Sequence, residues 1–291
     1  MANTFITPSI IANEALDNLY EQLTVSRLVW RDFDNDFNGK VGDTINIRTP
    51  NVFAVNEFTR PGGITVQDVT ETSQTLALDT IPDVSWVVTA EELSLEVSDF
   101  SEQFIRPATQ AIAEYLDNKV VDALAGATSG LTDVVNGGTN DPVDLVDAGT
   151  ELNTVKVPMS DRNVIMPPVT AGDYLKDPLM HQADQRGDTQ GLREASIGRV
   201  FGFDTWMTTH YNTAGQHATA FHKTAAALAI RVPSAPNGVA PNQVGTASAG
   251  GIGLRVIQAY DIDLKQDVVS IDFLCGVKIL DTNRLVHVVT A

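Results

Sequence analysis

The stretch DFSEQFIRPATQAIAEYLDNKVVDALAG, residues 99–126, has the most extended helical pattern in the chain. Asp99 and Glu102 have the spacing of a capping box, and Gly126 is placed to end the helix. Pro107 is expected to kink the first part or to mark the true start. One apolar stripe runs along it, formed by Phe104, Ile105, Ala108, Ile112, Tyr115, Leu116, Val120, Ala123 and Leu124. The stripe predicts a long helix that packs on a core along one side.

A segment with a period of two precedes this helix. Apolar residues alternate with polar ones from Val41 on, at Ile45 and Ile47, at Leu76 and Leu78, and at Val84, Trp86 and Val88. Arg60-Pro61-Gly62-Gly63 supplies a turn between them. Residues 41–88 are therefore expected to form a long two-stranded excursion. Such a ribbon is marginal alone in water, so it should lie on something else, and a partner chain is one candidate.

The remaining segments mix helical and strand patterns. Residues 9–28 predict an amphipathic helix capped by Ser9, and Thr89 with Glu92 predicts a short one. Residues 233–253 are rich in Gly, Pro, Ser and Ala and are expected to be a loop. Further helices are expected at 144–155 and near Thr170, and strands at 163–168, 254–260, 268–274, 276–281 and 284–290. The order of elements indicates an α+β fold.

The composition excludes several classes of protein. The 291 residues carry a net charge of −18 without a run of Lys or Arg, which disfavours nucleic-acid binding through phosphates. The single cysteine, Cys275, excludes an intrachain disulfide and is expected to be a small buried apolar residue. The N-terminus lacks the pattern of a signal peptide, and no stretch has the apolar length of a membrane span. We expect a protein made in the cytoplasm that does not enter a membrane.

The sequence offers weak candidates for a metal site and none for catalysis. Asp34, Asp36, Asn38 and Gly39 match the start of a calcium loop, but Ile45 stands where the bidentate Glu belongs. His210, His217 and His222 fit no zinc spacing and are expected to be structural. Neither HExxH nor GxSxG occurs, and nothing pairs a nucleophile with a base. We expect no catalytic, metal or cofactor residues.

The glycines of SIGRVFGFDTWMTTH, residues 196–210, do not form a phosphate loop. Gly198 and Gly202 lack the following Lys and Ser or Thr of a Walker loop, and GGIG at 250–253 precedes a strand rather than a helix. The flanking residues favour a strand in which glycine allows a bulge or a close approach of backbone.

Several segments, in order, resemble the major capsid proteins of tailed bacteriophages, which have the Hong Kong 97 phage-type fold. The resemblance covers most of the chain. It is carried by NTFITPSIIANEALDNL, VGDTINIRTP, the segment 89–124, IGRVFGFDTWMT, AFHKTAAALAI and the strand series from 253 to 288.

The resemblance implies a division of the chain. Residues 1–40 would be the N-arm and 41–88 the E-loop hairpin that reaches over a neighbouring subunit. The peripheral domain, with its spine helix at 101–126, would comprise 89–127, 196–232 and 254–291. The axial domain would comprise 128–195 and 233–253. The implied function is assembly of hexamers and pentamers into an icosahedral shell around double-stranded DNA, in the virion.

Two features depart from parts of this family, and both bear on assembly. Some relatives form covalent crosslinks through a Lys of the E-loop, but here no Lys lies between Lys40 and Lys119, so non-covalent closure is expected. No long scaffolding segment precedes the N-arm, which implies a separate scaffolding protein. A portal and a decoration protein are further implied partners.

Arg48, Glu57 and Arg60 of the hairpin are the candidate residues for contacts between subunits, although an exposed ion pair contributes only about 0 to 1 kcal/mol. The acidic charge would keep the inner wall from adhering to packed DNA. Three alternatives remain: a nanocompartment shell of the encapsulin kind, a hydrolase whose site forms only in three dimensions, and a tail tube subunit, which should lack the long helix.

Overall fold

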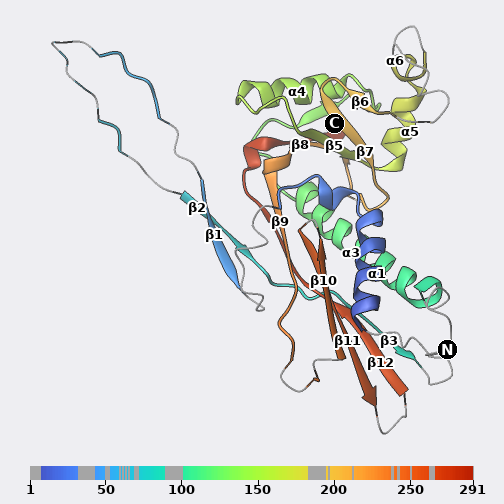
Figure 1. Cartoon of the computed structure of the whole chain (residues 1–291). Coiled ribbons are helices and arrows are strands. Elements are labelled where there is room, and N and C mark those ends of the chain that lie inside the picture. Colours follow the sequence, from blue (N-terminus) through green and yellow to red (C-terminus); the bar gives the residue numbers. More distant parts are fainter. Residues whose placement is uncertain are drawn as a thin grey trace.

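The computed structural model shows an elongated body from which one hairpin projects (Figure 1). It describes residues 8–31, 43–49, 53–58, 60, 62, 64, 66–68, 72–88, 101–182, 195, 197–211, 213–236, 239–240, 243–249, 251–261 and 266–290. The predicted calcium loop at 34–39 and the short helix after Thr89 lie outside these residues.

The long helix is present as α3, Arg106–Ala125, and one π-helical turn, Ser101–Ile105, leads into it. Pro107 lies in the first turn, where its missing N–H costs no hydrogen bond, so it marks the start rather than a kink. The N–H of Gly126 closes the last turn by donating to the Asp122 carbonyl at 2.9 Å. Most of the expected stripe is buried, but Tyr115 lies on the exposed side.

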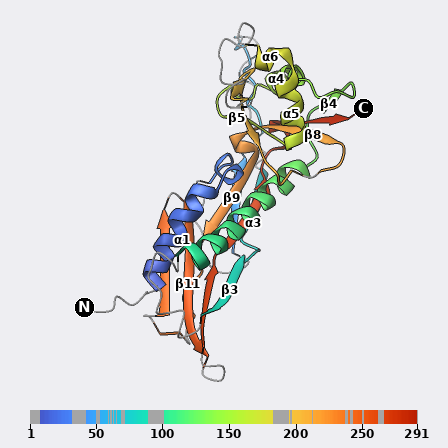
Figure 2. The same cartoon turned by 90° about the vertical axis from the view of Figure 1, so that its right-hand side faces the viewer.

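The lower part of the body is a four-stranded antiparallel sheet with the order β10-β11-β12-β3. Helix α1, Pro8–Gln22, lies on β10 and β11, and α3 lies beside α1 and reaches β3 (Figure 2). Trp86 of β3 stacks on Phe104 before α3, with ring centroids 6.5 Å apart. The strands are β3 Asp83–Val88, β10 Val244–Ala249, β11 Ile252–Asp261 and β12 Gln266–Asp272.

Strand β10 corrects the prediction that residues 233–253 form a loop. The small residues that indicated a loop are needed because α1 lies directly on this strand. A Cβ added at Gly245 would be 2.2 Å from the Pro8 carbonyl oxygen, and Ala247 is buried beside it. The composition reflected close packing of a helix on a strand rather than irregular backbone.

The upper part is a six-stranded mixed sheet with the order β4-β14-β8-β5-β7-β6. Its strands are β4 Val134–Asn136, β5 Arg162–Met166, β6 Arg199–Val200, β7 Phe203–Met207, β8 Gln216–His222 and β14 Leu285–Thr290. The helices around it are α4 Asp144–Thr154, α5 Pro168–Lys176 and α6 Pro178–His181.

Both faces of this sheet are covered. Val164 and Met166 of β5 pack with residues of α4 and α5, whereas Ile165 between them joins the core around α3. Every residue of β5 is buried, as expected for a strand between two layers.

The six-stranded sheet joins segments that the resemblance divides between two domains. Strands β6, β7 and β8 come from 196–232 and β14 from 254–291, yet they pair with the same sheet as β5, which comes from 128–195. Conversely, β10 comes from 233–253 and pairs with the lower sheet. Strands β9 Ala226–Arg231 and β13 Leu274–Ile279 form a separate antiparallel pair. Along the sequence, each of these strands lies between a strand of one large sheet and a strand of the other.

Replacing Gly245 by Ala should lower the free energy of unfolding by about 1 to 3 kcal/mol, because the new methyl group would overlap the backbone of α1. Gly172 of α5 is the matched control, since a Cβ there meets nothing within 4 Å. Gly172→Ala should leave stability unchanged or raise it by about 0.5 to 1 kcal/mol. Urea unfolding of the two variants measures the difference, and equal effects would contradict the packing of α1 on β10.

Candidate functional site

Among the described residues of the hairpin that projects from the body, the paired strands lie near its base. Strand β1, Thr44–Thr49, pairs antiparallel with β2, Thr72–Ala77, so that Thr44 lies opposite Ala77 and Thr49 opposite Thr72. Farther out, the Gln67 side chain bridges the two arms by bonding the N–H and carbonyl of Ala54. The predicted excursion therefore exists, but β3 does not belong to it, because β3 pairs with β12 in the lower sheet.

The outer part of the hairpin exposes large apolar side chains. Val55 is 99% exposed, and the others are Phe53, Phe58, Ile64 and Val66. Water-exposed apolar side chains gathered on one narrow ribbon are unfavourable unless another surface covers them. They indicate that the outer part of the hairpin is a contact surface for another molecule.

The three predicted contact residues lie along the same hairpin. Arg48 is in β1 opposite Ser73, and its side chain is exposed. Glu57 and Arg60 are exposed and lie beyond the paired strands. The fold thus brings all three to the projecting element, and their contacts with a neighbour stay a prediction.

The base of the hairpin is fixed to the body by buried apolar residues. Leu76 and Leu78 are fully buried against Ala227, Ala229 and Leu274 of the β9–β13 pair. The Leu78 N–H donates to the Asp43 carbonyl at 2.9 Å, which joins the two arms at the base. A rigid base and an uncovered outer part are thereby combined in one element.

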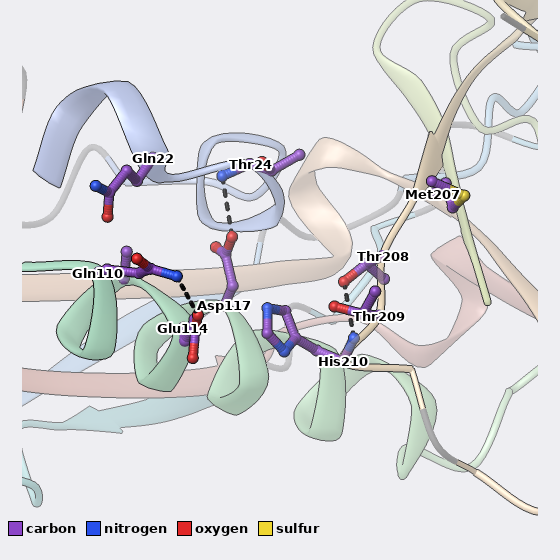
Figure 3. A pocket seen from close by; sticks show the side chains of 10 residues that line it. Gln22, Thr24, Gln110, Glu114, Asp117, Met207, Thr208, Thr209 and His210 are labelled. Atoms are coloured by element: carbon purple, nitrogen blue, oxygen red, sulfur yellow. Dashed lines mark hydrogen bonds between the residues drawn. The ribbon is translucent and has the colours of Figure 1, made fainter. Parts of the chain in front are cut away.

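A groove of about 440 Å3 lies where the end of α1, the side of α3 and the segment after β7 meet (Figure 3). Asp117 of α3 is its most buried acidic group. The Asp117 carboxylate accepts hydrogen bonds from the Thr24 N–H at 3.0 Å, the Ser26 N–H at 2.8 Å and the Ser26 hydroxyl at 2.6 Å. It therefore caps the turn after α1 and holds the N-terminal segment on α3.

Both acidic groups of the groove accept hydrogen bonds from within the protein. Glu114 accepts a hydrogen bond from Gln110 at 2.9 Å, and Asp117 is satisfied by the groups that it caps. No Ser or Cys is among the residues that line the described groove.

The other expected candidates are dispersed. His217 bonds Thr290, His222 bonds Thr224 at 2.8 Å, and His210 lines the groove. Burial lowers the pKa of His222, and burial raises the pKa of the Cys275 thiol to about 11, so Cys275 is a buried, protonated thiol as expected. Within the described ranges, no cluster of acidic, His or Cys side chains could hold a metal ion, and no helix is long and apolar enough to cross a membrane.

The glycine-containing strand turns out to be a tight hairpin at the sheet edge. Val200 pairs with Phe203, and the two residues between them, Phe201 and Gly202, have φ of 49° and 90°. Positive φ at both positions is the pattern of a type I′ turn. The expected close approach of backbone is wrong for Gly202, because a Cβ there would meet nothing within 4 Å. Its glycine is required by the turn.

No protein-family model and no curated protein matches the sequence. Solved structures do match over most of the chain. A structure from Mycobacterium phage Che8 has a TM-score of 0.66 at 19% identity, over 91% of this chain and 90% of that one. The capsid structure of the cyanophage P-SCSP1u has a TM-score of 0.64 at 12% identity, over 86% of this chain and 84% of that one.

The chain has a phage capsid protein fold. The α+β class expected from the sequence is confirmed with it. The chain is also similar to a virus-like particle from Pyrococcus furiosus, with a TM-score of 0.53 at 12% identity over 96% of this chain and 97% of that one. Among the described residues, those of the outer hairpin include five large apolar side chains, each at least 63% exposed.

Sequence reasoning missed the residues that hold the parts of this capsid fold together. No local pattern marks Asp117, because the residues that it holds lie 91 and 93 positions away in the sequence. Gly276 and Lys119, which touch the base of the hairpin, gave no local signal either. The one available sign was a polar residue on the inner side of the helix, between the apolar Ala113 and Val120.

Replacing Gly202 by Ala should lower the free energy of unfolding by about 1 to 2 kcal/mol, because Ala would have to adopt the left-handed backbone conformation of this position. Crowding would not contribute, since the space around the position is open. Gly202→Asn should cost less than Gly202→Ala, since Asn tolerates positive φ despite its larger side chain. Gly202→Val should cost the most. Thermal or urea unfolding ranks the variants, and an Asn variant less stable than the Ala variant would show that space is limiting after all.

Proposed function

We propose that this protein is the major capsid protein of a tailed phage, and that its copies form the hexamers and pentamers of an icosahedral shell around double-stranded DNA. The observation that carries the proposal is the projecting hairpin with uncovered apolar side chains, in a chain with a phage capsid protein fold. The role is structural and uses no catalytic group or resident cofactor.

A second copy of the chain is the natural cover for the hairpin. In a shell of identical subunits, the hairpin of each copy lies on a neighbouring copy. Each copy therefore covers the hairpin of one neighbour and has its own hairpin covered by another. The β1–β2 ribbon has few internal pairs and would be marginal alone, which makes a partner surface part of its stability. Arg48, Glu57 and Arg60 would then add polar contacts around an apolar centre.

The two parts of the body correspond to the two domains of such a subunit. We assign the lower sheet with α1 and α3 to the peripheral domain, and the six-stranded sheet with α4, α5 and α6 to the axial domain. This assignment follows sheet pairing and therefore moves β6, β7, β8 and β14 to the axial domain and β10 to the peripheral domain. The hairpin is the E-loop.

The net charge of −18 suits a wall that must hold DNA without binding it, because clustered cations would release counterions from the phosphates and make the DNA adhere. The protein would be made in the host bacterial cytoplasm and end in the virion. A separate scaffolding protein, a portal and a decoration protein are the partners that this role requires or allows.

A nanocompartment shell is the second candidate, because the fold also resembles the virus-like particle from Pyrococcus furiosus. The TM-score of 0.53 is lower than the 0.66 and 0.64 of the two phage structures. Purified native particles decide between the two roles. DNA inside them supports the capsid, and an enclosed enzyme supports the compartment.

Assembly should depend on the apolar outer part of the hairpin. Val55→Asp combined with Phe58→Asp should leave the chain folded, because both side chains are exposed, but should prevent shells from forming, because two carboxylates would be buried at each contact. Electron microscopy and sedimentation compare the variant with the unaltered protein, together with whatever scaffolding protein is needed.

Val55→Thr is the matched control, since it keeps the shape of the side chain and adds no charge. It should assemble. Normal shells from the doubly charged variant would remove the hairpin from the contact, and failure of the unaltered chain to form any closed particle would overturn the proposed function itself.

Mature shells should dissociate into single chains in a boiled denaturing gel. No Lys lies between Lys40 and Lys119, so the hairpin has no amine for an isopeptide bond. The expected result is one band at 31.3 kDa. A ladder of larger species that survives reducing agent would show covalent closure through another part of the chain.

A further inference from the structure

The connection from the hairpin to the body passes across strand β13 at a glycine. A Cβ added at Gly276 would lie 1.9 Å from the Ala77 carbonyl oxygen and 3.4 Å from the Leu78 Cα. Even one methyl group would force the two backbones apart. Gly276 therefore fixes how closely the end of β2 approaches β13.

Backbone hydrogen bonds hold the next residues of this connection. The Cys275 N–H donates to the Thr80 carbonyl at 2.9 Å, and the Thr80 N–H donates to the Cys275 carbonyl at 3.2 Å. Gly276 thus lies against Ala77, just before Leu78 and Asp79, and Cys275 bonds Thr80, just after them. The backbone that leaves the hairpin is aligned with β13 over this short crossing.

Helix α3 contacts the same crossing from another direction. The Lys119 ammonium lies 3.2 Å from an Asp79 carboxylate oxygen and also bonds the Thr80 hydroxyl. Burial opposes ionisation of Asp79, but hydrogen bonds from Thr80 and Lys119 outweigh it and lower the pKa of Asp79, which favours the ionised carboxylate. The Lys119 side chain is 23% exposed and that of Asp79 is 68% exposed. An exposed pair of this kind contributes only about 0 to 1 kcal/mol to stability. It nevertheless links α3 to the residues that leave the hairpin.

The length of the hairpin magnifies small rotations at this crossing. An extended arm of about 15 residues, the sequence length from Thr44 to Phe58, would span about 50 Å at about 3.3 Å per residue. A rotation of about 5° at the base would then move Phe58 by about 4 Å, whereas apolar contacts are lost when surfaces separate by more than about 1 Å. Contact with a neighbour is therefore sensitive to the direction of the hairpin.

We propose that Gly276 and Lys119 are positioning residues that set the direction of the hairpin relative to α3, and that they thereby determine the angle at which neighbouring copies join. This rests on the proposed function only for its second half. Gly276 sets the closeness of the crossing, and Lys119 links it to the helix that runs through the body.

The direction of the hairpin is measurable in the unassembled chain by pulsed electron paramagnetic resonance. Glu57→Cys on the hairpin and Ala111→Cys on α3 are exposed sites for spin labels. Cys275 does not interfere, because it is fully buried. Gly276→Ala should shift the mean distance between the labels by several ångströms, and Lys119→Met should broaden the distribution.

Lys176→Met is the control, because Lys176 also forms a surface pair, with Asp173 at 2.8 Å, but lies on α5 away from the hairpin. It should give the distribution of the unaltered chain. Lys119→Arg should restore most of the narrow distribution. Unaltered distributions in both Gly276→Ala and Lys119→Met would overturn the proposal, and if Gly276→Ala fails to fold, Lys119→Met decides by itself.

Particles report on the second half of the proposal. Chains with a shifted or broadened distribution should give shells of altered size or open sheets in electron microscopy. Normal shells from such chains would disprove the effect of the hairpin direction on the angle between copies. The first half of the proposal, that these residues set the hairpin direction, would still stand. The distance measurement does not require assembly, so it stands even if the unaltered chain forms no shell.

Discussion

The packing of helix α3 along its buried stripe is the interaction on which the rest of the molecule depends. The helix contacts α1 and β3 in the lower part of the body, β13 in the middle and β8 in the upper sheet. Its side chains at Ile112, Leu116 and Leu124 belong to one core cluster that includes residues of both sheets. Asp117 and Lys119, on the same helix, hold the N-terminal segment and the base of the hairpin. One rigid rod thus fixes the relative positions of parts that are distant in sequence.

Glycine is needed at two places where backbone meets backbone. At Gly245 the start of α1 lies on β10, and at Gly276 the end of β2 crosses β13. In both cases an added methyl group would overlap a carbonyl oxygen, so contact at this distance is possible only without a Cβ. Gly202 is different, because it has open space around it and is required by a turn with positive φ. The same residue type therefore supports the fold in two physically separate ways.

The subunit is well packed in its body and incomplete in its hairpin. Residues near the base, such as Leu76, are fully buried, whereas Val55 is almost fully exposed on the same element. A chain that folds for itself alone would gain nothing from holding apolar side chains in water. Under the proposed function a second copy covers these side chains, and the geometry of the hairpin base would then set the geometry of the assembly.

Sequence alone determined the elements with a strong local period: α3, α4 and the strands from β11 to β14, together with the hairpin and the buried state of Cys275. Local patterns suffice there because burial on one face repeats at a fixed spacing. Tertiary structure decided that β10 is a strand, that β3 leaves the hairpin, and that β6, β7, β8 and β14 share a sheet with β5. Those outcomes depend on which distant segment lies beside each strand. A carbonyl oxygen from α1 above Gly245, or from β2 above Gly276, leaves no periodic trace in the residues that meet it.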